Sequence, residues 1–153
     1  MSSQTYVNEK GAGQKHSDLG HYSQAVILGD IVKCSGQGGW DSEGNLEGYD
    51  ERAQIDNAFD NVDRVLQAAG LRGWEDVRND QLAIPFKPHT DIKPQVYCLR
   101  SYQLNIGEHW SYLVEKLRKR IPDHRPIWTA LSVPSLAFKP MTVELEVEAI
   151  RRH

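Results

Sequence analysis

The octapeptide VELEVEAI, Val143–Ile150, alternates apolar and acidic residues from end to end. Successive side chains of a β-strand point to opposite faces, so the pattern predicts a strand with one apolar and one acidic face. The acidic face carries Glu144, Glu146 and Glu148. Like charges in a row repel one another unless water, a cation or a proton relieves them. One face of this strand therefore belongs to a core, and the other is either wet or part of a polar site.

The bulk composition limits the class of protein to which the strand belongs. The chain has 153 residues, 39% of them hydrophobic and 25% charged, which is typical of one soluble globular domain and not of a disordered, fibrous or membrane protein. A net charge of −3 does not favour nucleic acid or anionic membranes as partners. The N-terminal residues contain no apolar stretch typical of a signal peptide, so we expect a cytoplasmic protein.

Hydrophobic periodicity predicts the remaining elements. Residues 1–20 are polar and are expected to form a mobile arm, followed by a single domain over 21–153. The proline-containing stretch 78–94 is interpreted as a loop insertion. Strands are predicted at Tyr22–Leu28 and Ile31–Ser35, joined by a type II′ turn at Gly29-Asp30, and at 95–104, 126–133 and 141–150; helices are predicted at 51–70 and 106–122. This order predicts an α+β fold, a mixed sheet covered on one face by two helices.

The strand predicted at 126–133 indicates what the acidic face could contact. If the aliphatic faces of the last two strands both lie beneath the helices, Trp128, Ala130 and Ser132 share the open face with the glutamates. An open sheet face with a large aromatic residue is typical of an oligomer interface. We therefore expect self-association.

Other residue patterns indicate little specific chemistry. The six histidines are scattered and no Cys or His pair has ligand spacing, so no metal is expected. Cys34 lies within an apolar run and is interpreted as a core thiol rather than a nucleophile. The segment Gly36–Gly39 follows a strand, and it is either a plain turn or a set of exposed amides that meet an anion.

Four segments together resemble the RidA/YjgF family, also called the L-PSP or reactive-intermediate deaminase family. They are YSQAVILGDIVKCSGQGG at 22–39, NAFDNVDRVLQAAGLRGWEDV at 57–77, HRPIWTALSV at 124–133 and VELEVEAI at 143–150. The resemblance implies a chorismate-mutase-like α+β fold that assembles as a homotrimer, with a small metabolite bound in a cleft between subunits. It also implies hydrolysis of the reactive enamine or imine products of amino-acid dehydratases, such as 2-aminoacrylate, to a 2-keto acid and ammonia, without a cofactor.

The resemblance assigns roles to individual residues. Glu146 matches the glutamate that holds the attacking water, Tyr22 matches a cleft tyrosine, and the ligand-binding segment Ser-Gly-Gln corresponds to Ser35, Gly36 and Gln37.

Two further cleft positions depart from the family pattern. Trp128 stands where the family has a carboxylate-binding arginine, and Ala130 where it often has cysteine. An indole has one neutral N–H donor, so it does not replace a bidentate guanidinium. Arg100 and Arg125 are the candidates for a compensating cation, and parity alone does not place Arg100 on either face.

Three functions follow from this comparison. The first is hydrolytic deamination of an enamine or imine, with a substrate altered by Trp128, for example one that lacks an α-carboxylate and stacks on the indole. The alternative is a non-catalytic, metabolite-binding or chaperone-like trimer. The third is endoribonuclease activity, an older label of the family, which the acidic charge balance disfavours.

Overall fold

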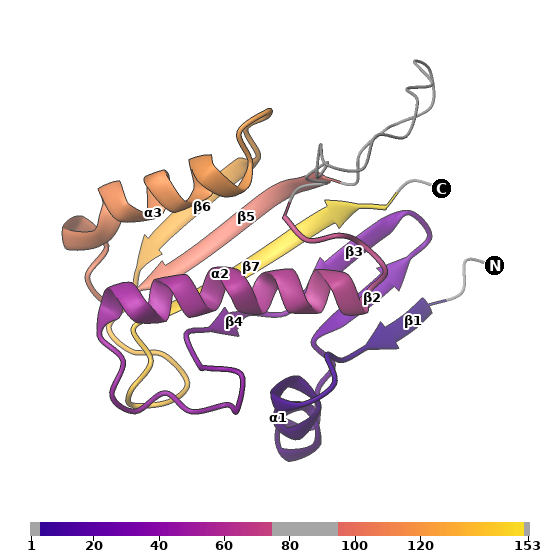
Figure 1. Cartoon of the computed structure of the whole chain (residues 1–153), viewed down its shortest axis with the longest axis horizontal. Helices are drawn as coiled ribbons and strands as arrows, with labels where there is room; N and C mark the ends of the chain where they lie inside the picture. The colour runs from indigo at the N-terminus through magenta and orange to yellow at the C-terminus, as the bar shows by residue number, and fades with distance from the viewer. Residues whose placement is uncertain (1–3, 75–94, 152–153) are drawn as a thin grey trace, which may run out of the picture.

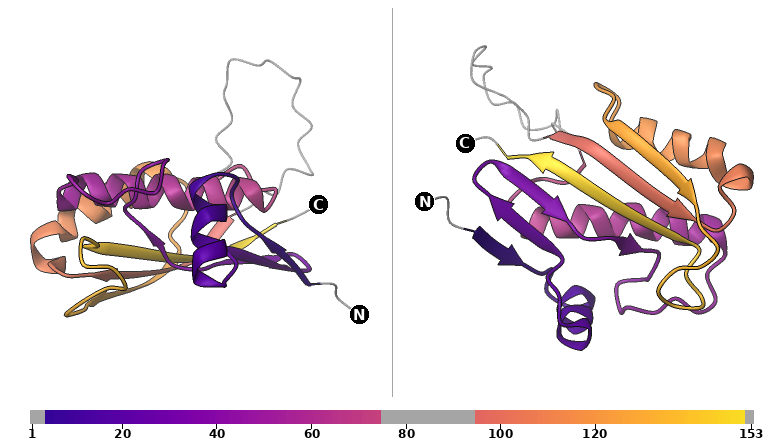
Figure 2. Two further views of the ribbon diagram at one scale, coloured as in Figure 1. Left: turned by 90° about the horizontal axis from the view of Figure 1, so that it is seen from below. Right: turned by 180° about the vertical axis from the view of Figure 1, so that it is seen from behind.

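The computed structural model describes residues 4–74 and 95–151, which form one mixed sheet with helices against one of its faces (Figures 1 and 2). The strands lie in the spatial order β1-β2-β3-β7-β5-β6, and β4 also pairs with β7. In chain order the elements are β1 (Gln4–Val7), α1 (Ala12–Gly20), β2 (Ala25–Leu28), β3 (Ile31–Cys34), β4 (Gln37–Gly38), α2 (Glu51–Ala68), β5 (Gln95–Gln103), α3 (Ile106–Arg120), β6 (Ile127–Ser132) and β7 (Val143–Ile150). None of the described helices has the length and apolar character that a membrane crossing needs.

The central strand is β7, and its alternation behaves as the sequence predicts. Val143, Leu145, Val147 and Ala149 are each at most 1% exposed, whereas the residues between them are half-buried on the other face. The apolar row packs beneath α2, the long helix that crosses the sheet in Figure 1. The burial of this row fixes which face of the sheet belongs to the core.

Helix α2 supplies the other half of that core. It begins after Asp50, whose side chain accepts a hydrogen bond of 2.8 Å from the backbone N–H of Ala53. Ile55, Phe59 and Val62 recur at helical spacing and are at most 1% exposed. The predicted helix over 51–70 is thus confirmed, and helix α3 confirms the one predicted over 106–122.

The predicted hairpin is also present. β2 and β3 pair antiparallel from Ala25↔Cys34 to Leu28↔Ile31, and Gly29 between them has a φ of 60°. A positive φ at the first central position is what a type II′ turn requires, and glycine adopts it without a steric penalty. The predicted insertion over 78–94 lies outside the described residues.

The expectation of a mobile arm over residues 1–20 is wrong for the part of it that the structure describes. Strand β1 extends the sheet by pairing with β2, and helix α1 follows it. Side-chain hydrogen bonds to the backbone hold the segment: Asn8 Oδ1 accepts from the N–H of Gln24 at 2.9 Å, and Gln24 Oε1 accepts from the N–H of Glu9 at 2.8 Å. Because these contacts are polar, the segment has no repeating pattern of apolar residues from which its strand and helix could be predicted.

The face predicted for Trp128 is wrong as well. β5 and β6 pair in parallel with Leu99 opposite Trp128, and Leu99 lies opposite the buried Val147 of β7. Trp128 therefore points to the helix side, where its ring stacks on Trp110 of α3 with centroids 4.7 Å apart. Its indole N–H donates to Ser101 Oγ at 2.9 Å. Ala130 and Ser132 share this face, so the open face receives the other row of β6 instead.

This placement predicts a structural role for Trp128. Replacing Trp128 with Ala removes the stack and the hydrogen bond, and should lower the free energy of unfolding by about 3 kcal/mol. Trp128→Phe keeps a ring against Trp110 and should cost about 1 kcal/mol, the worth of the lost hydrogen bond. Urea denaturation of the three proteins measures both values. An unchanged stability in Trp128→Ala would contradict the role.

Candidate functional site

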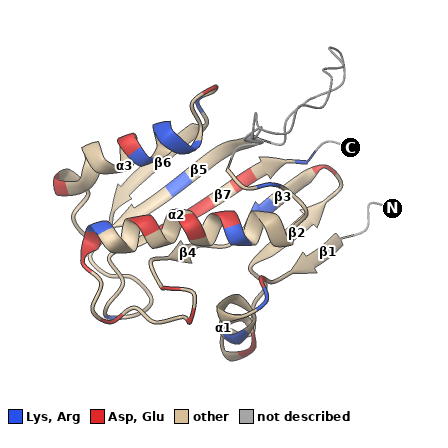
Figure 3. Ribbon diagram, in the orientation of Figure 1, with Lys and Arg blue, Asp and Glu red and all other residues tan. Residues whose placement is uncertain are grey.

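The open face of the sheet is organised by the acidic row of β7. Strand register places Glu146 opposite Arg100 and Glu144 opposite Tyr102, both on β5. Glu148 lies opposite Lys33 on β3. Figure 3 shows acidic positions on β7 between basic positions on β5 and β3. The counter-charges for the glutamate row thus come from both neighbouring strands.

Arg100 connects two of the three glutamates. Its Nη1 donates to Glu146 Oε1 at 3.0 Å and to Glu148 Oε1 at 3.1 Å. The hydrogen bond to Glu148 is the largest of the influences that raise the pKa of Arg100. The face of Arg100, which the sequence left open, is therefore the glutamate face.

Glu148 has the most complete set of partners. Tyr97 donates its hydroxyl to Glu148 Oε2 at 2.6 Å, and Lys33 Nζ lies 3.3 Å from the same oxygen. The hydrogen bond from Tyr97, followed by those from Arg100 and Lys33, outweighs burial and lowers the pKa of Glu148. Its side chain is 12% exposed. Glu148 therefore serves as a charged anchor rather than as a group open to a ligand.

Glu146 is held in place but stays accessible. Its Oε1 accepts from Arg100, and its Oε2 accepts from the Tyr102 hydroxyl at 3.2 Å. Its side chain is 34% exposed, against 12% for Glu148. A carboxylate oriented by two donors and open to solvent is suited to binding and polarising a water molecule.

Glu144 lies in a different environment from the other two. Its carboxylate extends over the backbone of Gly36, and burial followed by repulsion from Glu146 raises its pKa. Tyr22 is close enough to be affected, because burial and then Glu144 raise the pKa of the tyrosine. Environment therefore divides the three glutamates of one row into a charged anchor, an accessible carboxylate and a carboxyl whose pKa is raised.

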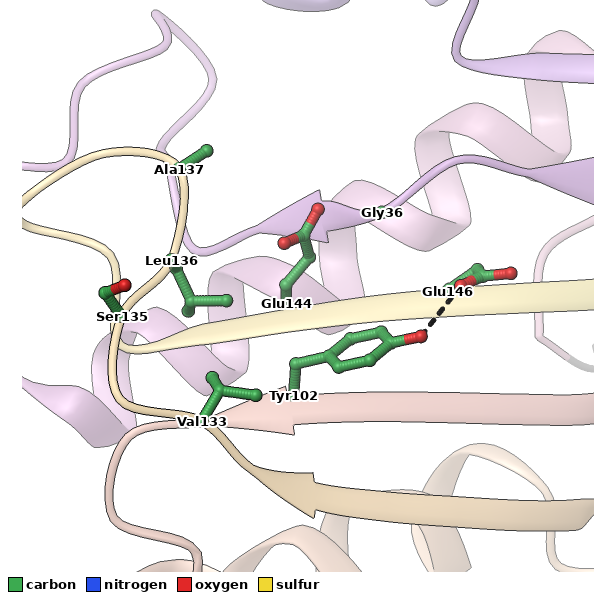
Figure 4. A pocket seen from close by; sticks show the side chains of 8 residues that line it. All are labelled: Gly36, Tyr102, Val133, Ser135, Leu136, Ala137, Glu144 and Glu146. Carbon is green, nitrogen blue, oxygen red and sulfur yellow. Dashed lines mark hydrogen bonds between the residues drawn. The ribbon is translucent and has the colours of Figure 1, made fainter.

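A pocket opens at one end of this row. Its volume is about 460 Å³. Figure 4 shows the side chains that surround it. It is lined by Gly36, Tyr102, Val133, Ser135, Leu136, Ala137, Glu144 and Glu146. One wall therefore consists of glutamates and a tyrosine from the sheet, and the opposite wall is the mostly apolar segment that follows β6.

The structure brings only some of the predicted site residues together. Glu146 and Gly36 line the pocket, whereas Tyr22 lies outside its lining, near enough to Glu144 for that carboxylate to add to the rise in the pKa of Tyr22. Trp128 and Ala130 lie on the other face of the sheet, where they do not meet a ligand bound at Glu146. Arg125 is exposed just before β6.

Ser35 and Gln37 take part in a hydrogen-bond network outside the pocket lining. Gln37 is fully buried, and its Nε2 donates to the carbonyl and hydroxyl oxygens of Ser35 at 3.0 and 3.2 Å. Gln24 in turn donates to Gln37 Oε1 at 3.0 Å. This network fixes the end of β3 and so the position of the adjacent Gly36.

Sequence reasoning did not identify several of the residues that line the pocket. Tyr102 shares strand parity with Arg100, so placing β5 against β7 would have found it. The wall formed by Val133, Leu136 and Ala137 has no comparable signal, because it depends on how the segment after β6 folds back.

Thiol and metal chemistry find no support in the described residues. Cys34 is buried in the core, as predicted, and burial raises its pKa to about 12, which keeps the thiol protonated. Among residues 4–74 and 95–151, no three His, Cys, Asp or Glu side chains gather so that they could hold a metal ion.

The fold and this site define an α+β protein with an open acidic sheet face, and comparison with known proteins gives its family. The family model described as "Endoribonuclease L-PSP" matches residues 13–151. The chain therefore belongs to this family, which is the RidA/YjgF family that the sequence resembles. A search of curated protein sequences gives no match.

Solved structures agree with this fold. A protein described as YJGH is 24% identical, with 98% of each chain covered and a TM-score of 0.71. Rv2704 from Mycobacterium tuberculosis is 24% identical over 97% of this chain and 99% of its own, with a TM-score of 0.68. The Rid-family protein YyfA from Yersinia pestis is 20% identical over the same shares, with a TM-score of 0.72. At these identities the likeness shows the fold alone.

The contrast between Glu144 and Glu148 predicts opposite effects of pH on stability. The pKa of Glu144 is raised on folding, so the folded protein favours the protonated carboxyl. The free energy of unfolding therefore falls as pH rises from the ordinary glutamate pKa to the raised pKa of the folded state. Glu144→Gln should therefore raise the melting temperature at pH 7.5, and the gain should disappear below about pH 4.

Glu148→Gln is the matched comparison. The pKa of Glu148 is lowered on folding, so its stabilising effect is present above the ordinary glutamate value and is lost as pH falls. At pH 7.5 this variant should melt at a lower temperature than the wild type. In acid, the two melting temperatures should become similar. Thermal melts at both pH values test the pair, and shifts of the same sign at pH 7.5 would contradict the assignment.

Proposed function

We propose that the protein hydrolyses a reactive imine or enamine to a carbonyl compound and ammonia, and that it works as a homotrimer. The observation that carries the proposal is Glu146, a partly exposed carboxylate that lines a pocket and is oriented by Arg100 and Tyr102. Membership of the family supports the reaction type, and the chemistry needs a positioned water and a proton carrier rather than a cofactor.

The reaction follows from the position of Glu146. Its carboxylate accepts a proton from water while the oxygen of that water forms a bond to the imine carbon, and the C=N electrons move to nitrogen. The protonated Glu146 then returns the proton to nitrogen. The hydroxyl proton passes to nitrogen as the C–N bond breaks, so that the oxygen forms the carbonyl and the nitrogen leaves as ammonia. An enamine first takes a proton at carbon and loses one from nitrogen, which gives the same imine.

Arg100 and Tyr102 act as positioning residues. They occupy one oxygen each of Glu146 and so fix the plane of its carboxylate. Trp128 does not form a stacking platform for the substrate, because its indole lies on the helix side of the sheet and packs against Trp110 of α3. The substrate therefore has to be inferred from the pocket lining instead.

Replacement of one carboxylate oxygen of Glu146 by an amide nitrogen tests the proposed reaction. Glu146→Gln removes the proton acceptor and retains the shape, and should lower kcat/KM at least a hundredfold. Imines generated in situ, from an amine by an amine oxidase and from an amino acid by an amino-acid oxidase, provide the substrates. Competition with semicarbazide measures the rate at which each imine is lost. Equal rates for the wild type and Glu146→Gln would remove Glu146 from the mechanism.

Glu115→Gln is the control variant for this assay. It makes the same chemical change on an exposed side chain of α3, 56% exposed and paired with Lys119. Its kcat/KM should equal that of the wild type.

A second function, metabolite binding without turnover, is favoured by one observation. Both oxygens of Glu146 already accept hydrogen bonds from the protein, so fewer of their lone pairs remain to accept a proton from water. Saturable thermal stabilisation by a carbonyl compound, with no acceleration of imine loss, would support the binder. Ribonuclease activity is disfavoured, because two glutamates in the pocket repel a phosphate backbone.

The homotrimer is proposed from the uncovered face of the sheet. Helices α2 and α3 cover one face and leave the other uncovered (Figure 2). Strand register places apolar residues on the uncovered face beside the glutamate row. Ile127, Leu131 and Ile31 on it are 70%, 48% and 38% exposed. Apolar residues around a charged centre are typical of a protein interface. A neighbouring subunit on this face would close the pocket.

Substitution of Leu131 tests the assembly. Three copies of the 17.4 kDa chain should elute with a mass of about 52 kDa in light-scattering chromatography. Leu131→Arg places a charge in the interface and should yield monomers. Leu19→Arg changes a residue of α1 that is 87% exposed, and should leave the mass unchanged. A monomeric wild type would contradict the proposal.

A further inference from the structure

The carboxylate of Glu144 occupies the place where the sequence suggested an anion site. Glycines after β3 offer backbone amides to an anion, and Gly36 does line the pocket. A Cβ on Gly36 would lie 1.9 Å from Glu144 Oε1, 2.5 Å from its Cδ and 2.7 Å from its Cγ. The outer half of the Glu144 side chain therefore rests directly on the glycine backbone, and the absence of a side chain at position 36 makes room for it.

This contact places a negative charge inside the pocket. Glu144 and Glu146 both line it, and none of its described lining residues is basic. The two described cations of the neighbouring strands, Arg100 and Lys33, are paired with Glu146 and Glu148. A ligand carboxylate that enters beside Gly36 thus meets like charges and has no described lining cation to pair with, which is costly at short range.

The opposite wall of the pocket favours an apolar substituent. Val133, Leu136 and Ala137 present aliphatic side chains across from the two glutamates (Figure 4). A ligand with a positively charged nitrogen and a hydrocarbon body would satisfy both walls. A protonated imine has this charge, and an imine of an amino acid carries in addition the carboxylate that the pocket disfavours.

We propose that Glu144 is a specificity-determining residue that makes the pocket select carboxylate-free imines with an apolar substituent over imines of amino acids. The inference rests on the proposed function and names its substrate class. Glu144 acts in two ways: its bulk fills the space above Gly36, and its charge repels anions and attracts the iminium nitrogen.

A matched pair of substrates tests the selection. The imine of leucine and the imine of 3-methylbutylamine have the same hydrocarbon body and differ by the carboxylate. The wild type should hydrolyse the second with a kcat/KM at least tenfold higher. Glu144→Gln, which keeps the bulk, and Glu144→Ala, which removes it, should each raise the rate on the leucine imine about tenfold. Glu47→Gln, on an exposed loop, is the control and should change neither rate.

A binding measurement keeps this inference separate from the proposed reaction. Titrations with 4-methyl-2-oxopentanoate and with 4-methyl-2-pentanone, followed by NMR chemical shifts, report the cost of a carboxylate without turnover. The carboxylate should bind Glu144→Gln about tenfold more tightly than it binds the wild type, and the ketone should bind both equally. Equal carboxylate affinities would overturn the inference, even if imines are hydrolysed. Hydrolysis of neither imine would overturn the proposed function, and the titration would still decide the role of Glu144.

Discussion

The alternation along β7 is the constraint on which the rest of the molecule depends. Its apolar row is buried beneath α2, so its glutamates have to lie on the uncovered face of the sheet. A slip of one residue would bury three carboxylates and expose the core. Strands β3 and β5 both pair with β7, and this register fixes which of their side chains meet the glutamates.

The same register makes the three glutamates unequal. Arg100, Tyr97 and Lys33 converge on Glu148, which becomes the charged anchor of the row. Glu146 also accepts a hydrogen bond from Arg100 but lines the pocket, and Glu144 lies over Gly36. Position along one strand thus gives the three carboxylates different environments, because the neighbours differ at each step of two residues.

Much of the fold could be predicted from the sequence, since it depends on local periodicity. The hairpin, helices α2 and α3 and strands β5, β6 and β7 all carry period 2 or period 3.6 patterns, and glycine marks the turn between β2 and β3. The segment from β1 to α1 was missed because Asn8, Glu9 and Gln24 hold it through polar contacts. Such contacts leave no periodic signal.

The candidate site was harder to predict, because it depends on pairing between strands. The prediction for Trp128 assumed that the aliphatic row of β6 lies beneath the helices, whereas the half-buried indole lies there and contacts Trp110 and Ser101. Glu146 was identified from the family resemblance, and Arg100 needed the register of β5 to be placed beside it. The contact between Glu144 and Gly36 joins segments more than a hundred residues apart and follows from tertiary structure alone.

A crystal structure of the assembled protein would show whether the acidic face of β7 is the functional face. We expect that a second subunit covers this face and leaves a closed cavity containing Glu144 and Glu146, with Trp128 on the far side against Trp110. A crystal structure in which this face is bare in every copy, or is covered without a cavity at Glu146, would contradict it.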